Sequence, residues 1–169
     1  LEEPRAGALP QARIEGQLHG LEEVIGSVPL DCQIRLNSGN TYAASKIATA
    51  EALENLPPDQ RIAVICFNDD AALGALHAAQ QLDREQDVAI VGQGADRLIR
   101  EELRRPGTRI IGSTAFMPER YGEKLIDLAL RILRGEPTPP AVYIDHVFID
   151  PGNVDADALA VAGATSPKT

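Results

Sequence analysis

Along this chain, short apolar runs alternate with stretches in which apolar positions repeat at helical spacing. Residues 62–67 (Ile-Ala-Val-Ile-Cys-Phe) and 88–91 (Val-Ala-Ile-Val) are apolar at consecutive positions. A strand with no polar face is typical of the middle of a parallel sheet that helices cover on both sides. Further strands are expected at residues 32–36, 109–113 and 142–149.

Helices are expected between these strands. Residues 11–25 carry apolar side chains at intervals of four, three and four, the spacing of a helix that packs on one face. A second helix runs to about residue 55, and Asn40 or Thr41 is able to cap its start. The remaining helices are expected from residue 68 to about 82, in a short polar stretch that ends near 103, and from Pro118 to Gly135.

The alternation of strands and helices with short connections predicts an α/β fold built on a doubly wound parallel sheet. In such sheets the ligand lies beyond the carboxyl ends of the strands. This rule directs attention to Asn68, to residues 93–96 and to residues 114–116.

Length and charge narrow the class of protein. A chain of 169 residues fits one domain, or one lobe with a fragment of another. Its net charge of −9 argues against a nucleic-acid surface, which needs clustered Lys and Arg. No apolar window is long enough to span a membrane. The start at Leu1, without Met, basic region or apolar signal core, favours a processed or trimmed chain.

Two residue types at the expected ligand edge could bind a small polar molecule. The Asn68 amide offers a donor and an acceptor to a hydroxyl or carbonyl group, and Arg13 offers a planar fork of donors near the start of the first helix. Each has an ordinary structural alternative that the spacing leaves open. Asn68, Asp69 and Asp70 could simply cap the following helix, and Arg13 could be a solvated surface side chain. Cys66, within an apolar run, is expected to be a buried thiol.

Patterns of catalysis and cofactor binding are incomplete or missing in the sequence. Gly92-Gln93-Gly94 follows a strand but lacks the third glycine of a dinucleotide fingerprint. Neither a phosphate-binding GxxxxGK[ST] loop nor a GxSxG motif occurs. His19, His77 and His146 lie on separate predicted elements, which argues against a zinc site. We therefore predict no catalytic residue, no metal and no cofactor.

Four segments together resemble the type I periplasmic-binding-protein family, which includes sugar-binding proteins of ABC transporters and lactose-repressor-type regulators. Residues 65–76 (ICFNDDAALGAL) resemble its strand–helix junction, and residues 87–92 (DVAIVG) resemble the strand that follows. Residues 116–122 (FMPERYG) are similar to a crossover between its two lobes. Arg13-x-x-Gly16 is similar to a helix opening that carries a sugar-contacting Arg.

The resemblance implies a division of the chain between two lobes. Residues 1–115 would form the C-terminal ligand-binding lobe, and 116–135 a helix belonging to the other, mostly absent lobe. Residues 136–150 would return as an edge strand, and 151–169 would be a tail. Residues 1–3 would be the end of the first strand of the C-terminal lobe.

The resemblance also implies site residues for a ligand held in a cleft between the lobes. Arg13 and Asn68 match family ligand contacts, and Phe116 stands at a crossover position where an aromatic ring could stack on a sugar. Family members often carry an Asp where this chain has Gly94, and Asp96 in the same loop would replace it.

The function that the resemblance implies is binding of a small polar, sugar-like ligand as the solute-binding component of an ABC importer. The partner would be an ABC permease and the location periplasmic or extracellular. The alternative is the effector-binding core of a lactose-repressor-type transcriptional regulator, which would be cytoplasmic. An enzyme is not expected.

Overall fold

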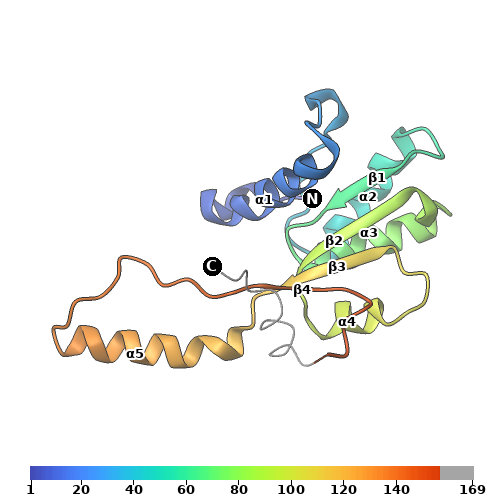
Figure 1. The fold of residues 1–169 in the computed structure, drawn as a ribbon. Coiled ribbons are helices and arrows are strands. Elements are labelled where there is room, and N and C mark those ends of the chain that lie inside the picture. The colour runs from blue at the N-terminus through green and yellow to red at the C-terminus, as the bar shows by residue number, and fades with distance from the viewer. Residues whose placement is uncertain (157–169) are drawn as a thin grey trace.

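The computed structural model describes residues 1–156, in which strands and helices alternate around one sheet (Figure 1). The sheet has the order β1-β2-β3-β4, formed by β1 (Ile62–Ile65), β2 (Val88–Gly94), β3 (Ile110–Ala115) and β4 (Val147–Ile149). The first three strands are parallel, and β4 pairs antiparallel with β3. The predicted α/β fold with a mainly parallel sheet is therefore confirmed.

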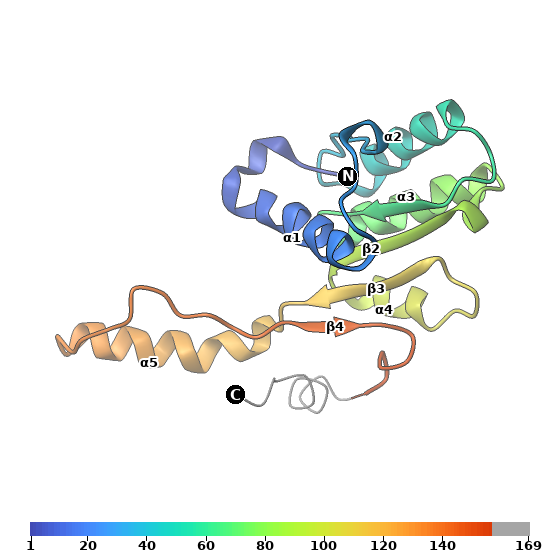
Figure 2. The ribbon, with the colours of Figure 1, turned by 45° about the horizontal axis from the view of Figure 1, so that its top comes forward.

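Each parallel strand is followed by a helix or by a turn that leads into one. The helices are α1 (Ala8–Ile25), α2 (Tyr42–Asn55), α3 (Asp69–Gln81), α4 (Arg97–Leu103) and α5 (Tyr121–Leu133). Short 3-10 turns lie at Pro4–Ala6, Leu30–Cys32, Glu85–Asp87 and Pro118–Arg120. In both views α1 lies apart from the pair α2 and α3 (Figures 1 and 2).

The helix boundaries follow local capping chemistry. The hydroxyl of Thr41 accepts a hydrogen bond from the Ala44 N–H at 3.3 Å and begins α2, one of the two caps predicted. Gly135, just after α5, has a φ of 69°, and its N–H donates to the Ile132 carbonyl at 3.0 Å. The left-handed conformation after a helix end favours Gly, so the predicted end of this helix is confirmed.

The core lies between α3 and the sheet and consists largely of small side chains. Ala71, Ala72, Ala75, Ala78 and Ala79 on α3 have no exposed surface. Small residues let two backbones approach closely, and α3 packs against both α2 and β2. Larger apolar side chains from the strands and α4 complete the core: Val88, Ile90, Ile99, Leu103, Ile110 and Ile149.

Two strand predictions need correction. Residues 32–36 form no strand: a 3-10 turn ends at Cys32, and the isolated parallel bridge to Glu2 is made by the next residue, Asn37. β1 is not central but is the first strand of the four-stranded sheet. The missing strand at residues 32–36 and the edge position of β1 have one cause. Only Leu1 and Glu2 lie between this segment and β1, and a ladder forms only where backbone partners are present.

The chain after β3 leaves the sheet and returns to it. Figures 1 and 2 show α5 projecting away from the sheet, with the following segment running back along it into β4. The strand predicted at residues 142–149 is thus shorter, and its first residues belong to this returning segment. Of the predicted tail, residues 157–169 lie outside the described residues.

Candidate functional site

The carboxyl ends of β1, β2 and β3 meet at one edge of the sheet because the three strands are parallel. The register aligns Ile65 with Val91 and Gln93 with Thr114. The polar positions predicted after each strand therefore come together at the same edge. The middle of α1 also reaches this edge, since the Gln17 amide donates to the Cys66 carbonyl at 3.2 Å.

Arg13 is the most unusual side chain at this edge. It is half-buried, and its guanidinium carbon lies 5.2 Å from the centre of the Phe67 ring and 4.5 Å from that of Phe116. Such contacts attract a cation through the quadrupole of the ring. None of the ion pairs among the side chains that the structure describes includes Arg13, so in this part of the chain aromatic faces hold the guanidinium.

A second aromatic contact extends this cluster. The rings of Phe116 and His146 meet edge to face, with centroids 5.2 Å apart. Phe116 lies between β3 and α5, and His146 directly precedes β4. The structure thus joins two residues from the two chain segments that connect the sheet with α5. We call Arg13, Phe67, Phe116 and His146 the arginine–aromatic cluster.

The backbone of Arg13 is fixed by two amide side chains. The buried Gln93, at the end of β2, donates to the Arg13 carbonyl at 3.2 Å, and Gln17 donates to the same oxygen at 3.2 Å. The Oε1 of Gln17 is buried and has no hydrogen-bond partner among the described residues. The bond from Gln93 ties α1 to β2, whereas the bond from Gln17 lies within α1.

Asn68 is the N-cap of α3, as the structural alternative foresaw. Its Oδ1 accepts from the Ala71 N–H at 2.9 Å, and its Nδ2 donates to the Asn40 carbonyl at 3.3 Å. The Asn68 side chain is half-buried, and Phe67 precedes it in the sequence. A primary amide has two N–H groups and two acceptor lone pairs, so one of each remains beyond these two bonds.

Asp69 does not cap α3, contrary to one expectation for this motif. Its Oδ1 accepts from the Ser113 hydroxyl at 2.6 Å, and its Oδ2 accepts from the Asp96 N–H at 2.9 Å. The Ser113 oxygen in turn accepts from the Ala95 N–H at 3.0 Å. The buried Asp69 therefore links the start of α3, the loop after β2 and the middle of β3. Burial raises the pKa of this carboxyl above its usual value.

Two glycines at the end of β2 leave room for this carboxylate. A Cβ on Gly92 would lie 2.6 Å from Oδ1 of Asp69, and one on Gly94 would lie 2.7 Å from Oδ2. Gly94 also has a φ of 136°, a conformation that side chains rarely adopt. The Gly-Gln-Gly sequence thus serves the packing of Asp69.

Asp96 has a local role. Its Oδ1 accepts from the Ile99 N–H at 3.0 Å as the N-cap of α4, and the residue is exposed. The structure gives it no side-chain bond to Arg13, Asn68 or Phe116 within residues 1–156. Of the four predicted site residues, Arg13 and Phe116 are in direct contact.

Sequence reasoning missed two members of the arginine–aromatic cluster. Phe67 directly precedes Asn68 and could have been suspected from that position. His146 had no signal in the sequence, because its neighbour Phe116 is 30 positions away and only the returning chain brings them together. Gln93 fell within residues 93–96, which the strand-end rule indicated, although its bond to Arg13 could not be foreseen.

Within residues 1–156, no three His, Cys, Asp or Glu side chains gather as potential metal ligands. In the same range, no helix combines the length and apolar character needed to cross a bilayer.

The parallel sheet, its helices and the polar strand ends define the fold of type I periplasmic binding proteins. The chain belongs to the family described as periplasmic binding protein-like domain, whose pattern matches residues 10–148. Both the family and the solved structures below are described as binding proteins rather than enzymes. No curated protein sequence matches the chain.

Solved structures with the same fold have 17–23% sequence identity to this chain. A protein from Mycobacterium smegmatis has a TM-score of 0.75 at 23% identity, over 95% of this chain and 51% of that one. An Agrobacterium vitis ABC transporter solute-binding protein bound with α-D-tagatopyranose has a TM-score of 0.70 at 20% identity, over 89% of this chain and 48% of that one. A Bacillus halodurans ABC transporter solute-binding protein with bound myo-inositol has a TM-score of 0.66 at 21% identity, over 83% of this chain and 46% of that one. This chain spans about half or less of each.

Proposed function

We propose that the chain binds a small polar ligand, a sugar or polyol, at the carboxyl edge of the sheet. The observation that carries this proposal is the Arg13 guanidinium, seated on the Phe67 and Phe116 rings. A planar fork of donors suits neighbouring hydroxyls or a carboxylate. Aromatic rings beside it offer apolar faces to the C–H face of a sugar ring. The bound sugar and inositol of related solute-binding proteins support this class of ligand.

The rest of the cleft would come from a second lobe. Residues 1–115 would form one lobe and 116–135 part of the other, with 136–150 returning to the sheet. This division is supported by α5, which leaves Ile126 63% and Leu133 82% exposed. Large apolar side chains gathered on one helix usually mark a covered surface. Phe116 would then lie at the junction of the lobes.

The role we propose is that of the solute-binding component of an ABC importer, without turnover of the ligand. The description of related structures as ABC transporter solute-binding proteins supports this role. Its partner would be an ABC permease, and its place the periplasm or the outer face of the cell. Closure of two lobes over a ligand is a hinge motion.

Calorimetric titration tests the site. In the polypeptide that carries both lobes, D-tagatose, D-allose and myo-inositol are titrated into the wild type, Arg13→Ala and Asn68→Ala. Each substitution should weaken binding of the ligand by about 1–3 kcal/mol, because a polar partner in the closed cleft is left unpaired. Arg100→Ala is a matched control, since Arg100 donates to the Ala95 carbonyl at 2.7 Å and is not part of the cluster.

Asn68→Ala also removes a helix cap, so its folding stability must be measured separately. Asn68→Asp keeps an N-cap acceptor but removes the Nδ2 donor, which also bonds the Asn40 carbonyl at 3.3 Å, and adds a negative charge. Unchanged affinity in Arg13→Ala and Asn68→Asp would remove both residues from the site.

A further inference from the structure

The arginine–aromatic cluster contains a permanent positive charge and no carboxylate. Its members are one arginine, two phenylalanines and one histidine, and an imidazole is either neutral or positive. Arg13 is half-buried against the Phe67 and Phe116 rings. Closure of a cleft over it would bury the guanidinium further, and a buried charge without a partner is strongly unfavourable. A ligand with a negative charge would supply that partner.

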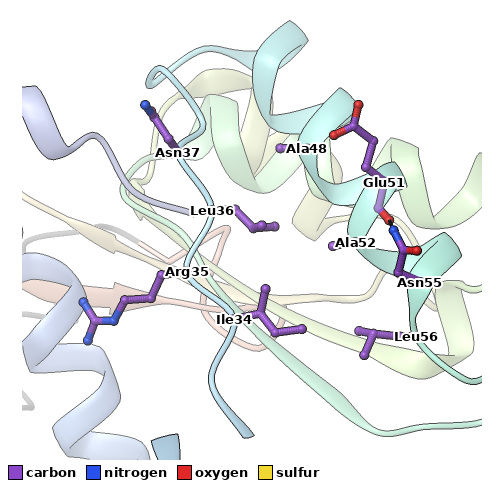
Figure 3. Close-up of a pocket in the computed structure, with 9 residues that line it drawn as sticks. All are labelled: Ile34, Arg35, Leu36, Asn37, Ala48, Glu51, Ala52, Asn55 and Leu56. Atoms are coloured by element: carbon purple, nitrogen blue, oxygen red, sulfur yellow. Dashed lines mark hydrogen bonds between the residues drawn. The ribbon is translucent and has the colours of Figure 1, made fainter. Parts of the chain in front are cut away.

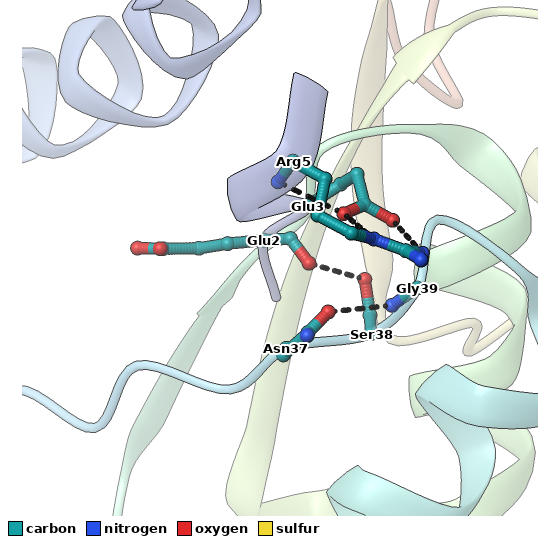
Figure 4. Close-up of polar contacts among 6 residues, drawn as sticks. All are labelled: Glu2, Glu3, Arg5, Asn37, Ser38 and Gly39. Carbon is teal, nitrogen blue, oxygen red and sulfur yellow. Dashed lines mark hydrogen bonds and ion pairs between the residues drawn. The ribbon is translucent and has the colours of Figure 1, made fainter. Parts of the chain in front are cut away.

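Acidic side chains near the start of α1 are held by other arginines. The Glu3 carboxylate accepts hydrogen bonds from the backbone N–H, Nε and Nη2 of Arg5, each at 3.0 Å (Figure 4). Arg35 donates to the Glu2 carboxylate at 2.8 Å and to that of Glu15 at 3.0 Å. Each of these three carboxylates therefore has a positive partner of its own.

The aspartates that follow the strands do not pair with Arg13 either. The buried Asp69 accepts hydrogen bonds at 2.6 and 2.9 Å from β3 and from the loop after β2, and Oδ1 of Asp96 accepts at 3.0 Å from the first turn of α4. A Cβ on Gly94 would lie 2.7 Å from Oδ2 of Asp69, so this position has no room for another carboxylate. Asp70 is exposed, and no ion pair among the described side chains joins it to Arg13.

The start of α1 favours the same sign of ligand charge. The helix begins at Ala8, its N-cap Gly7 provides no side-chain bond, and its first turn holds no acidic residue. The N–H groups at the start of a helix carry partial positive charge, which favours an anion. Arg13 lies in the second turn, so its charge and the polarity of the helix act in the same direction.

A groove elsewhere on the surface is less suited to an anion. It has a volume of about 540 Å³, lies between residues 34–37 and α2, and shares no residue with the arginine–aromatic cluster (Figure 3). Its lining includes Glu51, and the arginine on its wall, Arg35, already bonds Glu2 and Glu15. An anionic ligand is therefore expected at the cluster.

We propose that the ligand is a sugar acid, an aldonate or a uronate, whose carboxylate is bound by the Arg13 guanidinium. This inference rests on the proposed sugar site and specifies the charge of its ligand. The planar guanidinium donates two parallel hydrogen bonds to a carboxylate, and charge-assisted bonds are about twice as strong as neutral ones. A phosphate carries about two negative charges at neutral pH, whereas one carboxylate matches the one guanidinium of the cluster.

Pairs of ligands that differ in a single carboxylate test the proposal. D-galacturonate is compared with D-galactose, and D-gluconate with D-glucitol, by calorimetric titration into the polypeptide that carries both lobes. The acid of at least one pair should bind about tenfold or more tightly than its neutral partner, because it forms charged hydrogen bonds. Raising the salt concentration should weaken binding of the acid more than that of the neutral sugar.

Variants of Arg13 assign this preference to its charge. Arg13→Gln removes the charge and keeps a polar side chain, so it should reduce the preference for the acid to about twofold or less. Arg13→Lys keeps the charge without the planar fork and should retain part of the preference. Arg97→Gln is the matched control, because it removes one positive charge from an exposed residue that pairs with Glu101 at 2.6 Å; the preference should be unchanged.

Three results would contradict the proposal, and they can be told apart. Equal affinity for the acid and the neutral sugar in both pairs would refute the carboxylate and leave the sugar site in place. Tighter binding of D-galactose 6-phosphate than of D-galacturonate would assign a phosphate to Arg13 instead. If all these probes, together with D-tagatose and myo-inositol, fail to bind, the proposed sugar site is wrong and this inference is wrong with it.

Discussion

At the scale of single residues, Arg13 shows how a cation can be held ready without a carboxylate. Contacts with aromatic faces contribute about 0.5–2 kcal/mol, depending on desolvation, and they use none of the guanidinium N–H groups. An ion pair would fix the side chain equally well but would occupy the donors. Arg13 lies over both Phe67 and Phe116, so an arriving ligand has no internal salt bridge to break.

Asp69 is the residue on which the geometry of the strand ends depends. It accepts one hydrogen bond from β3 and one from the loop after β2. A buried carboxylate has lost much of its hydration, and two bonds compensate this loss only in part. The pKa of Asp69 is raised because the loss of hydration outweighs the hydrogen bonds that the carboxylate accepts.

Asp69→Asn should change the pH dependence of folding stability. Because the pKa of Asp69 is higher in the folded state than its unfolded value near 3.8, the folded state holds this proton more tightly. The wild type should therefore lose stability relative to Asp69→Asn as the pH rises from about 3.8 through the raised pKa, and the difference should level off above it. Urea unfolding of both proteins at a series of pH values measures this difference.

Ser113→Ala serves as the comparison for that experiment, because it removes a hydrogen bond to Asp69 and leaves the carboxyl group in place. It should lower stability at every pH, with the dependence on pH retained. A constant difference between wild type and Asp69→Asn from pH 4 to pH 8 would contradict the role assigned to burial.

At the scale of elements, α2 and α3 approach each other closely at Gly74. A Cβ at this position would lie 2.5 Å from the Tyr42 carbonyl oxygen and 3.0 Å from the Lys46 nitrogen. Both atoms belong to the backbone of α2, which cannot move without disturbing the core. The close packing of these helices therefore requires glycine here.

Gly74→Ala should destabilise the fold by about 1–3 kcal/mol, as expected for overpacking against backbone. Gly20→Ala is the matched control on α1, because nothing lies within 4 Å of a Cβ there. It should be neutral or stabilising by up to about 1 kcal/mol, since Ala favours a helix over Gly. Thermal unfolding of the two variants measures both effects, and equal stability would refute the close contact.

The elements that the sequence predicted well are those set by neighbouring residues. Thr41 and Gly135 mark helix ends through bonds to residues three positions away, so their signals are local. The strand expected at residues 32–36 failed for the opposite reason. A strand needs a partner, and pairing depends on residues distant in the chain.

For the candidate site, too, single residues could be predicted from local signals, but their contacts could not. Arg13 and Phe116 were predicted separately, but their contact across 103 positions depends on the whole fold. Asp69 was expected near a helix start and there it lies, but its bonds reach Ser113 and Asp96. Long-range contacts of this kind leave no pattern of spacing in one sequence.

At the scale of the whole molecule, α5 leaves an apolar face uncovered by the described residues. Its large exposed side chains are Leu125, Ile126, Leu130, Ile132 and Leu133. This face should cause the chain to self-associate as its concentration rises.

Replacing Ile126 and Leu133 with Lys should reduce this self-association. Light scattering after size-exclusion chromatography, over a tenfold range of concentration, measures the change in mean mass. Asp127→Lys changes the charge of the same helix at another exposed residue and should have a smaller effect. If all three proteins give the same mass at every concentration, the exposed face is not a contact surface.

The two chain segments that connect α5 with the sheet leave from adjacent strands, β3 and β4. Phe116 lies in the outgoing segment and His146 in the incoming one, with their rings in contact. Turning α5 relative to the sheet must therefore shift one ring against the other. Phe116 also contacts the Arg13 guanidinium, so the surroundings of this cation change with the orientation of α5. A ligand that binds Arg13 would therefore favour some orientations of α5 over others.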